Sequence, residues 1–201
     1  MAVKKAVCHY NKGVHGMKNI GIIIGSNRPN RISFDIATWV QKNLISSQFQ
    51  TNLIDLAKVN LPWLAEPEIP AKGHYTLETT QKWRDLINQY DGFIIVYPQY
   101  NWGYPAILKN ALDSLYSEWQ GKPISTVVFG SHGGFQADIA LSLILQGLHM
   151  NKLPINLSIS INDDMFSNHS FINIDDALAK YRPDVQQLGV CFENVLNNEL
   201  L

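Results

Sequence analysis

The chain has 201 residues, of which 46% are hydrophobic and 16% are charged, and its formal net charge at pH 7 is -1. This composition suits one globular domain, and the near-neutral charge argues against nucleic acid or an anionic membrane surface as a partner. The two cysteines, Cys8 and Cys191, lack disulfide-framework spacing, and no apolar run approaches the roughly 20 residues that span a bilayer, so we expect a cytoplasmic protein.

Residues 1–16 are polar and show no apolar periodicity, so we expect a mobile N-terminal extension followed by a single domain over residues 17–201. Short apolar runs and amphipathic stretches then alternate, which predicts an α/β fold with a parallel sheet. The expected strands cover residues 19–24, 51–55, 92–96, 124–129 and 153–161. The expected helices cover residues 32–46, 77–90, 105–119, 135–150 and 184–196.

The first expected strand is followed by the loop Gly25-Ser26-Asn27-Arg28-Pro29-Asn30-Arg31-Ile32-Ser33, which leads into a helix. Hydroxyl groups, guanidinium groups and the free N–H groups of a helix start all favour an anion. The loop lacks both the Walker A ending and the GxGxxG spacing of a dinucleotide fingerprint. The pattern therefore indicates a single terminal phosphate rather than ATP or a Rossmann-bound dinucleotide.

The third expected strand is followed by Pro98-Gln99-Tyr100-Asn101-Trp102-Gly103-Tyr104-Pro105. Two amides and three aromatic rings at the carboxyl end of a buried strand favour a flat polar ring, because open α/β sheets bind ligands at that edge.

The fourth expected strand is followed by Gly130-Ser131-His132-Gly133-Gly134, whose three glycines let the backbone approach a ligand closely. The helix after it is expected to follow a pattern through Ile139, Leu143 and Leu148. Because the three loops follow three parallel strands, we expect them side by side, binding a ligand with a phosphate at one end and a planar heterocycle at the other.

In these loops, in their order and in their spacing, the sequence resembles the NADPH-dependent FMN reductases of flavodoxin-like fold, a group that includes quinone, azo-dye and chromate reductases. The resemblance rests on the three loops and on Lys109-Asn110-Ala111-Leu112-Asp113, and it spans roughly residues 17 to 200. It implies a flavodoxin-like three-layer sandwich with a five-stranded parallel sheet in the order 2-1-3-4-5. It also implies FMN as the cofactor and NADPH or NADH as the co-substrate.

The resemblance assigns each loop a part of the cofactor. The FMN phosphate would be held by Ser26, Arg28, Asn30 and Ser33, with Arg31 beside them. The ribityl chain and one side of the ring would be lined by Pro98, Gln99, Tyr100, Asn101, Trp102 and Gly103. The pyrimidine edge would be approached by Ser131, His132, Gly133 and Gly134. No catalytic residue is assigned, because the flavin takes hydride from the nicotinamide and passes electrons to a small-molecule acceptor.

Several of these assignments have a purely structural alternative. Arg28 and Arg31 could be solvated charges, Trp102 and Tyr104 could be core or subunit contacts, and His132 could serve the turn. We expect no metal site, because the remaining histidines lack ligand spacing: His9, His15, His74, His149 and His169. The resemblance further implies a homodimer or homotetramer, in which the loop at residues 61–76 is a lid, a partner contact or an ordinary surface excursion.

Two other functions are compatible with the same loops. A flavodoxin-like electron carrier would bind FMN but usually has a Thr-rich phosphate loop and a strongly acidic surface, which this chain lacks. A non-catalytic sensor of flavin or nucleotide would use the pocket without turnover. The leading interpretation is an FMN-dependent NAD(P)H oxidoreductase that works by a ping-pong cycle.

Overall fold

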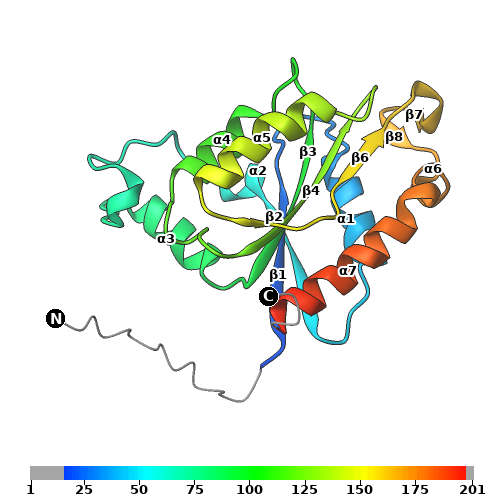
Figure 1. Cartoon of the computed structure of the whole chain (residues 1–201). Coiled ribbons are helices and arrows are strands. Elements are labelled where there is room, and N and C mark those ends of the chain that lie inside the picture. Colours follow the sequence, from blue (N-terminus) through cyan, green and yellow to red (C-terminus); the bar gives the residue numbers. More distant parts are fainter. Residues whose placement is uncertain (1–15, 198–201) are drawn as a thin grey trace.

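The computed structural model describes residues 16–197, in which strands and helices alternate along the chain as predicted (Figure 1). The expected N-terminal extension covers residues 1–16, and all of it except Gly16 lies outside the described residues. Its mobility, and the domain boundary at residue 17, therefore stay predictions.

The main sheet has the strand order β2-β1-β3-β4-β5, with β6 also paired to β4, and every pair is parallel. This confirms the flavodoxin-like order 2-1-3-4-5. The strands are β1 (Lys18–Ile24), β2 (Phe49–Asp55), β3 (Gly92–Pro98), β4 (Pro123–Gly130), β5 (Asn151–Lys152) and β6 (Leu157–Ser160). The last residue of β1 is in register with Asp55 of β2 and Val96 of β3, so these strands end at one edge.

Within the fifth expected strand, over residues 153–161, only β6 is a strand, and the short strand β5 precedes that range, with a break between the two. Pro154 lies in the break and has no N–H to donate to a ladder. At the break, hydrogen bonds that involve side chains replace the backbone ladder. Oδ1 of Asn156 accepts from the Thr126 amide at 3.0 Å, and Oγ of Ser125 donates to the Ile155 carbonyl at 2.7 Å. The polar groups of β4 are thus paired across the break.

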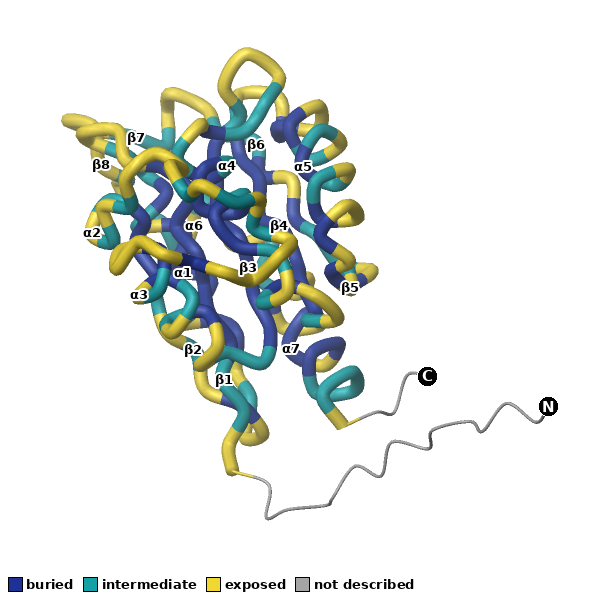
Figure 2. The backbone as a smooth tube through the Cα atoms, turned by 90° about the vertical axis from the view of Figure 1, so that its left-hand side faces the viewer, coloured by how far each residue is buried: buried dark blue, intermediate teal, exposed yellow. Residues whose placement is uncertain are grey.

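Helices cover both faces of the sheet, which gives the expected three layers (Figures 1 and 2). One core joins α1 (Ser33–Asn43) and α7 (Arg182–Leu196) to the first face. The other core joins α3 (Glu78–Ile87), α4 (Ala106–Asp113) and α5 (Phe135–Gly147) to the second face. All residues of β3 are buried, as expected for a parallel strand covered on both sides.

Helix α4 ends at Asp113, although the apolar pattern predicts a helix over residues 105–119. Two backbone carbonyls in the last turn of α4 bond to tryptophan side chains rather than only to backbone. The indole N–H of Trp83 donates to the Ala111 carbonyl at 2.9 Å, and that of Trp119 donates to the Leu112 carbonyl at 3.0 Å. Trp119 therefore remains buried, as its spacing suggests, although it lies beyond the helix.

Short elements lie in connections for which the sequence predicts neither helix nor strand. They are α2 (Leu56–Val59), α6 (Ile174–Ala177), the 3-10 turns η1 (Pro70–Lys72), η2 (Asp163–Met165) and η3 (Ala179–Tyr181), and the antiparallel pair β7 (Phe166–Ser167) and β8 (Ser170–Phe171). Across residues 16–197, no helix has both the length and the apolar content to cross a bilayer.

The loop at residues 61–76 is tied to the start of α3 by Glu66. Its carboxylate accepts hydrogen bonds from the amide and hydroxyl of Thr76, both at 2.8 Å, and from the Leu77 amide at 3.0 Å. Partial desolvation alone would raise the pKa of Glu66, but the hydrogen bonds outweigh it and lower the pKa from 4.5 to about 2. Glu66 thus stabilises this connection in its ionised form.

Replacing Glu66 by Gln should lower the free energy of unfolding near neutral pH by about 1 kcal/mol, the usual contribution of a side chain that caps a helix start. Because the folded pKa lies below the unfolded one, this contribution is complete above pH 4.5 and is lost as the pH falls toward 2. Urea unfolding at several pH values should therefore show the two proteins converging in acid. A difference independent of pH would contradict this, and Asp85→Asn, which removes an exposed carboxylate outside this loop, is the control.

Candidate functional site

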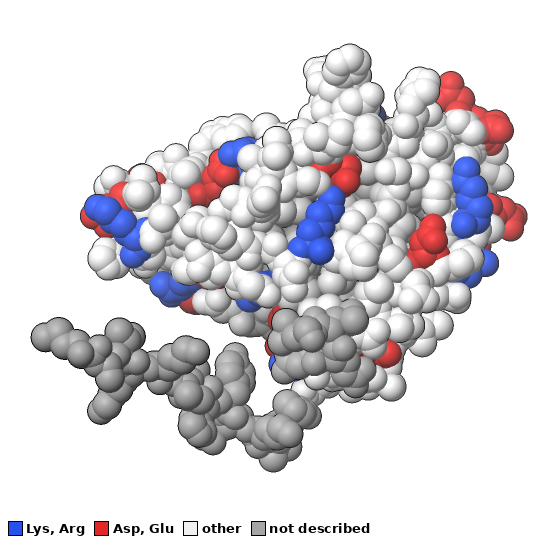
Figure 3. Space-filling view, in the orientation of Figure 1, with Lys and Arg blue, Asp and Glu red and all other residues white. Residues whose placement is uncertain are grey.

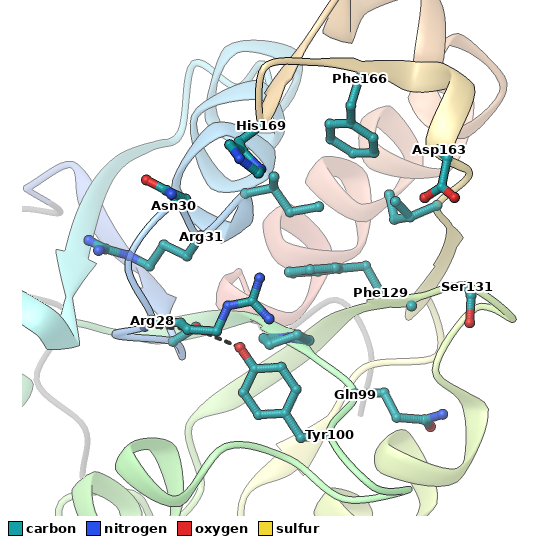
Figure 4. A pocket seen from close by; sticks show the side chains of 15 residues that line it. Arg28, Asn30, Arg31, Gln99, Tyr100, Phe129, Ser131, Asp163, Phe166 and His169 are labelled. Carbon is teal, nitrogen blue, oxygen red and sulfur yellow. Dashed lines mark hydrogen bonds between the residues drawn. The ribbon is translucent and has the colours of Figure 1, made fainter.

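A cavity of about 440 Å³ opens at the carboxyl-terminal edge of the sheet (Figure 4). Its walls come from the loop after β1, the ends of β3 and β4, and the segment after β6. Eight of the expected site residues line it: Ser26, Arg28, Asn30, Arg31, Pro98, Gln99, Tyr100 and Ser131. Seven expected residues are not in its lining: Ser33, Asn101, Trp102, Gly103, His132, Gly133 and Gly134.

The loop after β1 presents polar donors toward the cavity. Ser26 is buried, and its hydroxyl lies 3.2 Å from the hydroxyl of Tyr100, with either oxygen able to donate. Ser33, the first residue of α1, is fully buried, and its Oγ has no hydrogen-bond partner among the described residues. An unpaired buried hydroxyl at a helix start is unusual and favours a bound anion there.

Arg31 is held by a carboxylate that the sequence analysis did not single out. One of its terminal nitrogens donates to Oδ2 of Asp55 at 2.6 Å, while its Nε is buried without a partner among residues 16–197. Asp55 ends β2, and its Oδ1 also accepts from the Ala57 amide at 3.1 Å, which fixes the carboxylate. The Arg31 guanidinium is therefore oriented and partly neutralised, rather than free in solvent.

Arg28 is exposed and differs from Arg31 in this respect. Figure 4 shows its guanidinium reaching toward the middle of the cavity, above Tyr100. Among the residues that the structure describes, the Arg28 side chain makes no ion pair, so its donors are available to a ligand. The two arginines thus make one end of the cavity cationic.

The loop after β3 stands as a tight turn at the edge of the cavity. Tyr100 and Gly103 exchange two backbone hydrogen bonds of 2.8 Å, and the residues between them, Asn101 and Trp102, both have positive φ, 47° and 65°. Left-handed backbone in such residues is strained and often marks functional sites. The side chain of Trp102 is 71% exposed, so the turn presents an aromatic ring to solvent beside the cavity.

Gln99 has a structural role in addition to its place in the cavity wall. Its side-chain Oε1 accepts from the backbone amide of Ala137 in the first turn of α5 at 3.0 Å, and the backbone amide of Gln99 donates to the Phe129 carbonyl at 2.9 Å. These bonds connect the loop after β3 to the end of β4 and to α5. The Oε1 acceptor of Gln99 is thereby occupied by the protein itself.

The loop after β4 turns sharply into α5. Gly133 and Gly134 have φ values of 80° and 77°, and a Cβ on Gly134 would lie 2.6 Å from a methyl group of Val128. Glycine is therefore required at Gly134 on both grounds. The Oγ of Ser131 lies 3.1 Å from Nδ1 of the exposed His132, which places the imidazole beside the loop rather than in the cavity wall.

The cavity also contains residues that the sequence analysis did not predict. They are Ile32, Phe129, Gly130, Ile161, Asp163, Phe166 and His169. Ile32 lies between two predicted ligand residues, Gly130 lies in a predicted loop, and Phe129 directly precedes that loop. Extending the predicted loops would have found all three. The others come from the connection between β6 and α6, whose distance in sequence from the three loops gave no signal.

The arrangement has the chemistry of an elongated anionic ligand. The cationic end offers the guanidinium groups of Arg28 and Arg31, and the buried Nε of Arg31 has no partner among the described residues, which suits a phosphate. The unpaired hydroxyl of Ser33 lies outside the lining, next in sequence to the lining residue Ile32. Phe129 and Phe166 add apolar wall farther along the cavity (Figure 4). Within residues 16–197, no three His, Cys, Asp or Glu side chains gather as they would around a metal ion.

Comparisons with known proteins agree with this geometry. Over residues 18–163 the chain matches the family described as NADPH-dependent FMN reductase. It is 34% identical over 197 residues to the NAD(P)H-dependent FMN reductase LOT6 of Saccharomyces cerevisiae, covering 89% of this chain and 98% of the yeast protein. It is 41% identical over 146 residues to an NAD(P)H-dependent FMN reductase of Schizosaccharomyces pombe, covering 71% of this chain and 73% of that protein.

A solved structure supports the fold separately. The flavoenzyme NAD(P)H:(acceptor) oxidoreductase FerB from Paracoccus denitrificans superposes with a TM-score of 0.69 at 19% identity, covering 89% of this chain and 98% of that chain. The resemblance indicated by the three loops is thus confirmed over most of the sequence. This chain belongs to the NADPH-dependent FMN reductase family.

Proposed function

We propose that this protein is an FMN-dependent NAD(P)H oxidoreductase that reduces a small-molecule acceptor by a ping-pong cycle. Family membership supports the FMN cofactor and the nicotinamide co-substrate. The single observation that carries the proposal is the cavity whose cationic end holds two arginines, one of which has a buried Nε without a partner among the described residues. A terminal phosphate would accept from this donor and also balance the positive charge of the two guanidinium groups.

The proposed binding mode keeps the assignments made from the sequence. Ser26, Arg28, Asn30, Arg31 and Ser33 hold the phosphate. The backbone and side chains of residues 98–103 follow the ribityl chain and one side of the ring, and residues 131–134 approach its pyrimidine edge. The lining of the cavity supports the first group and the nearer members of the other two.

The bound flavin supplies the redox chemistry by accepting hydride from the nicotinamide and passing electrons on. The chain itself binds the flavin and orients its phosphate. Asp55 fixes the Arg31 guanidinium, and the Tyr100 hydroxyl pairs with Ser26, so the phosphate end is arranged before the ligand arrives. No acid or base of the protein is assigned a proton transfer in this scheme.

We infer that the acceptor is a flat molecule, such as a quinone, an azo compound or free flavin. A metal ion is a further acceptor that an exposed flavin ring could reduce. The solvent-exposed Trp102 beside the cavity supports this class, because an aromatic side chain offers a stacking surface to planar substrates. We further propose a cytoplasmic location, where reduced NADPH and NADH are both available, and make no assignment between the two.

We also propose a homodimer, on the basis of a correction to the sequence analysis. The sequence predicts an apolar helix pattern through Ile139, Leu143 and Leu148, of which only Leu148 is buried. The buried apolar residues within α5 are instead Ala137, Leu141 and Leu145. Phe135, Ile139 and Leu143 are 62%, 49% and 66% exposed, and their spacing of four aligns them on one side of the helix.

An exposed apolar stripe of this kind favours a protein partner. Figure 3 shows charged side chains on the α4–α5 side as small groups of both signs with uncharged surface between them. A second copy of the chain would bury the stripe, and we propose this assembly as the functional unit.

The reductase proposal predicts the behaviour of the purified protein after incubation with FMN and desalting. The flavin absorbance should be retained, should bleach when NADPH or NADH is added without oxygen, and should return when a quinone is added. Retained absorbance that never bleaches would favour an electron carrier or a sensor. Loss of all flavin on desalting would contradict the ligand assignment.

The phosphate assignment predicts that Arg28→Ala weakens FMN binding by about 1.5 to 3 kcal/mol, because one charge-assisted hydrogen bond is lost. Riboflavin, which has no phosphate, should bind the variant and the unaltered protein equally. Flavin fluorescence titrations measure both affinities, and Arg84→Ala, which removes an arginine on α3, is the control. Unchanged FMN affinity would remove Arg28 from the phosphate site.

The dimer proposal predicts that Leu143→Asp shifts the protein toward the monomer, because a carboxylate in an apolar interface must be desolvated. Light scattering after size exclusion measures the mass. Ile45→Asp is the matched control, since Ile45 is 77% exposed and follows α1 at the amino-terminal edge of the sheet. Equal masses for both variants and the unaltered protein would contradict this interface.

A further inference from the structure

The hairpin formed by β7 and β8 has no role in the binding mode described so far. Its residues 166–171 follow β6 and η2, and two of them, Phe166 and His169, line the same cavity as Arg28 and Arg31. Figure 4 shows His169 and Phe166 on the side of the cavity opposite Tyr100, with His169 nearest Asn30 and Arg31. The hairpin therefore faces the cationic end across open space.

The hairpin is fixed in this position at its base. The Ile161 amide donates to the Gly130 carbonyl at 3.0 Å, which ties the chain leading to the hairpin to the end of β4. The Ile172 amide donates to the Met165 carbonyl at 2.9 Å, and the rings of Phe166 and Phe171 lie 4.5 Å apart between centroids. Phe171 also packs against the core beside α1. The tip of the hairpin is thus held over the cavity.

The turn of the hairpin has an unusual residue at its tip. Asn168 and His169 both have left-handed backbone, with φ values of 50° and 65°. Two-residue hairpin turns of this form favour Asn followed by Gly, because both positions require positive φ. Here the glycine position is occupied by His169, which has a Cβ and is disfavoured there. Strain of this kind is retained where the side chain serves a function.

The charges around His169 indicate what that function is. From the loop after β1 it faces Arg28 and Arg31, and the only carboxylate paired with them in the described chain is Asp55, already bound to Arg31. Asp163 lies on η2, on the same wall as His169 but farther along it (Figure 4). An anion between them could accept hydrogen bonds from the imidazole N–H on one side and from the guanidinium groups on the other. The hairpin thus adds a third donor group to the cationic end.

We propose that His169 donates a hydrogen bond to the phosphate of FMN from the side opposite Arg28, which makes the β7–β8 hairpin the second wall of the phosphate site. This inference rests on the proposed function, since it needs FMN in the cavity. It extends the site to a segment more than 130 residues from the phosphate loop in sequence.

The variant His169→Gly tests this inference without endangering the fold. It restores the Asn-Gly pair that this turn favours, so the melting temperature should stay equal or rise. The affinity for FMN should fall at least about tenfold, as for loss of one hydrogen bond to a charged group, while the affinity for riboflavin stays unchanged. The ³¹P NMR resonance of bound FMN should also shift.

His149→Gly is the matched control. His149 also has left-handed backbone, with a φ of 55°, but it lies in the turn between α5 and β5, away from the cavity. It should leave both flavin affinities unchanged.

Three results would overturn the inference. An unchanged FMN affinity in His169→Gly would remove the histidine from the site. Equal losses for FMN and riboflavin would show that the hairpin covers the rest of the flavin and does not recognise the phosphate. Failure of the unaltered protein to bind FMN would overturn the proposed function itself, and this outcome is separate because it is seen before any substitution.

Discussion

The central strands of this protein are buried on both faces, and parallel pairing forces their carboxyl ends to one edge of the sheet. Every residue of β3 is buried, and its end at Pro98 is in register with Phe129 of β4. The loops after β1, β3 and β4 therefore emerge beside one another, whatever their own sequences are. The cavity is a consequence of this constraint, and the identities of the loop residues decide only what it binds.

Electrostatic arrangement at one end of the cavity explains why it suits an anion. A guanidinium in a partly buried site needs a partner, and Asp55 supplies one to Arg31 while also capping α2. The start of α1 adds backbone N–H groups and the buried Ser33 hydroxyl. These donors are held by packing before any ligand binds, so little ordering remains to oppose binding.

Two strained turns flank the cavity and have the same form. Asn101–Trp102 and Asn168–His169 each place two consecutive non-glycine residues in the left-handed region. In each pair the second residue carries a ring, and both rings are exposed to solvent. Strain repeated at one site, on two unrelated segments, indicates that the ring positions matter to function more than local stability does. In the proposed binding mode, the Trp102 turn lies toward the acceptor and the His169 turn lies toward the phosphate.

Much of this protein could be predicted from the sequence. Apolar runs such as residues 92–96 determine strands covered on both faces, and the glycine, arginine and amide pattern of the three loops indicated the family, because both signals are local along the chain.

Other features depend on segments that meet only after folding. The pairing of Asp55 with Arg31, the helix end set by Trp83 and Trp119, and the placement of His169 over the cavity each join residues that no local pattern connects. The exposed side of α5 belongs here too, because a helix with apolar residues all around it buries whichever side the sheet contacts. Sequence thus determined the elements and the ligand class, while tertiary structure decided which side chains meet, since contact between distant segments is a property of the folded chain alone.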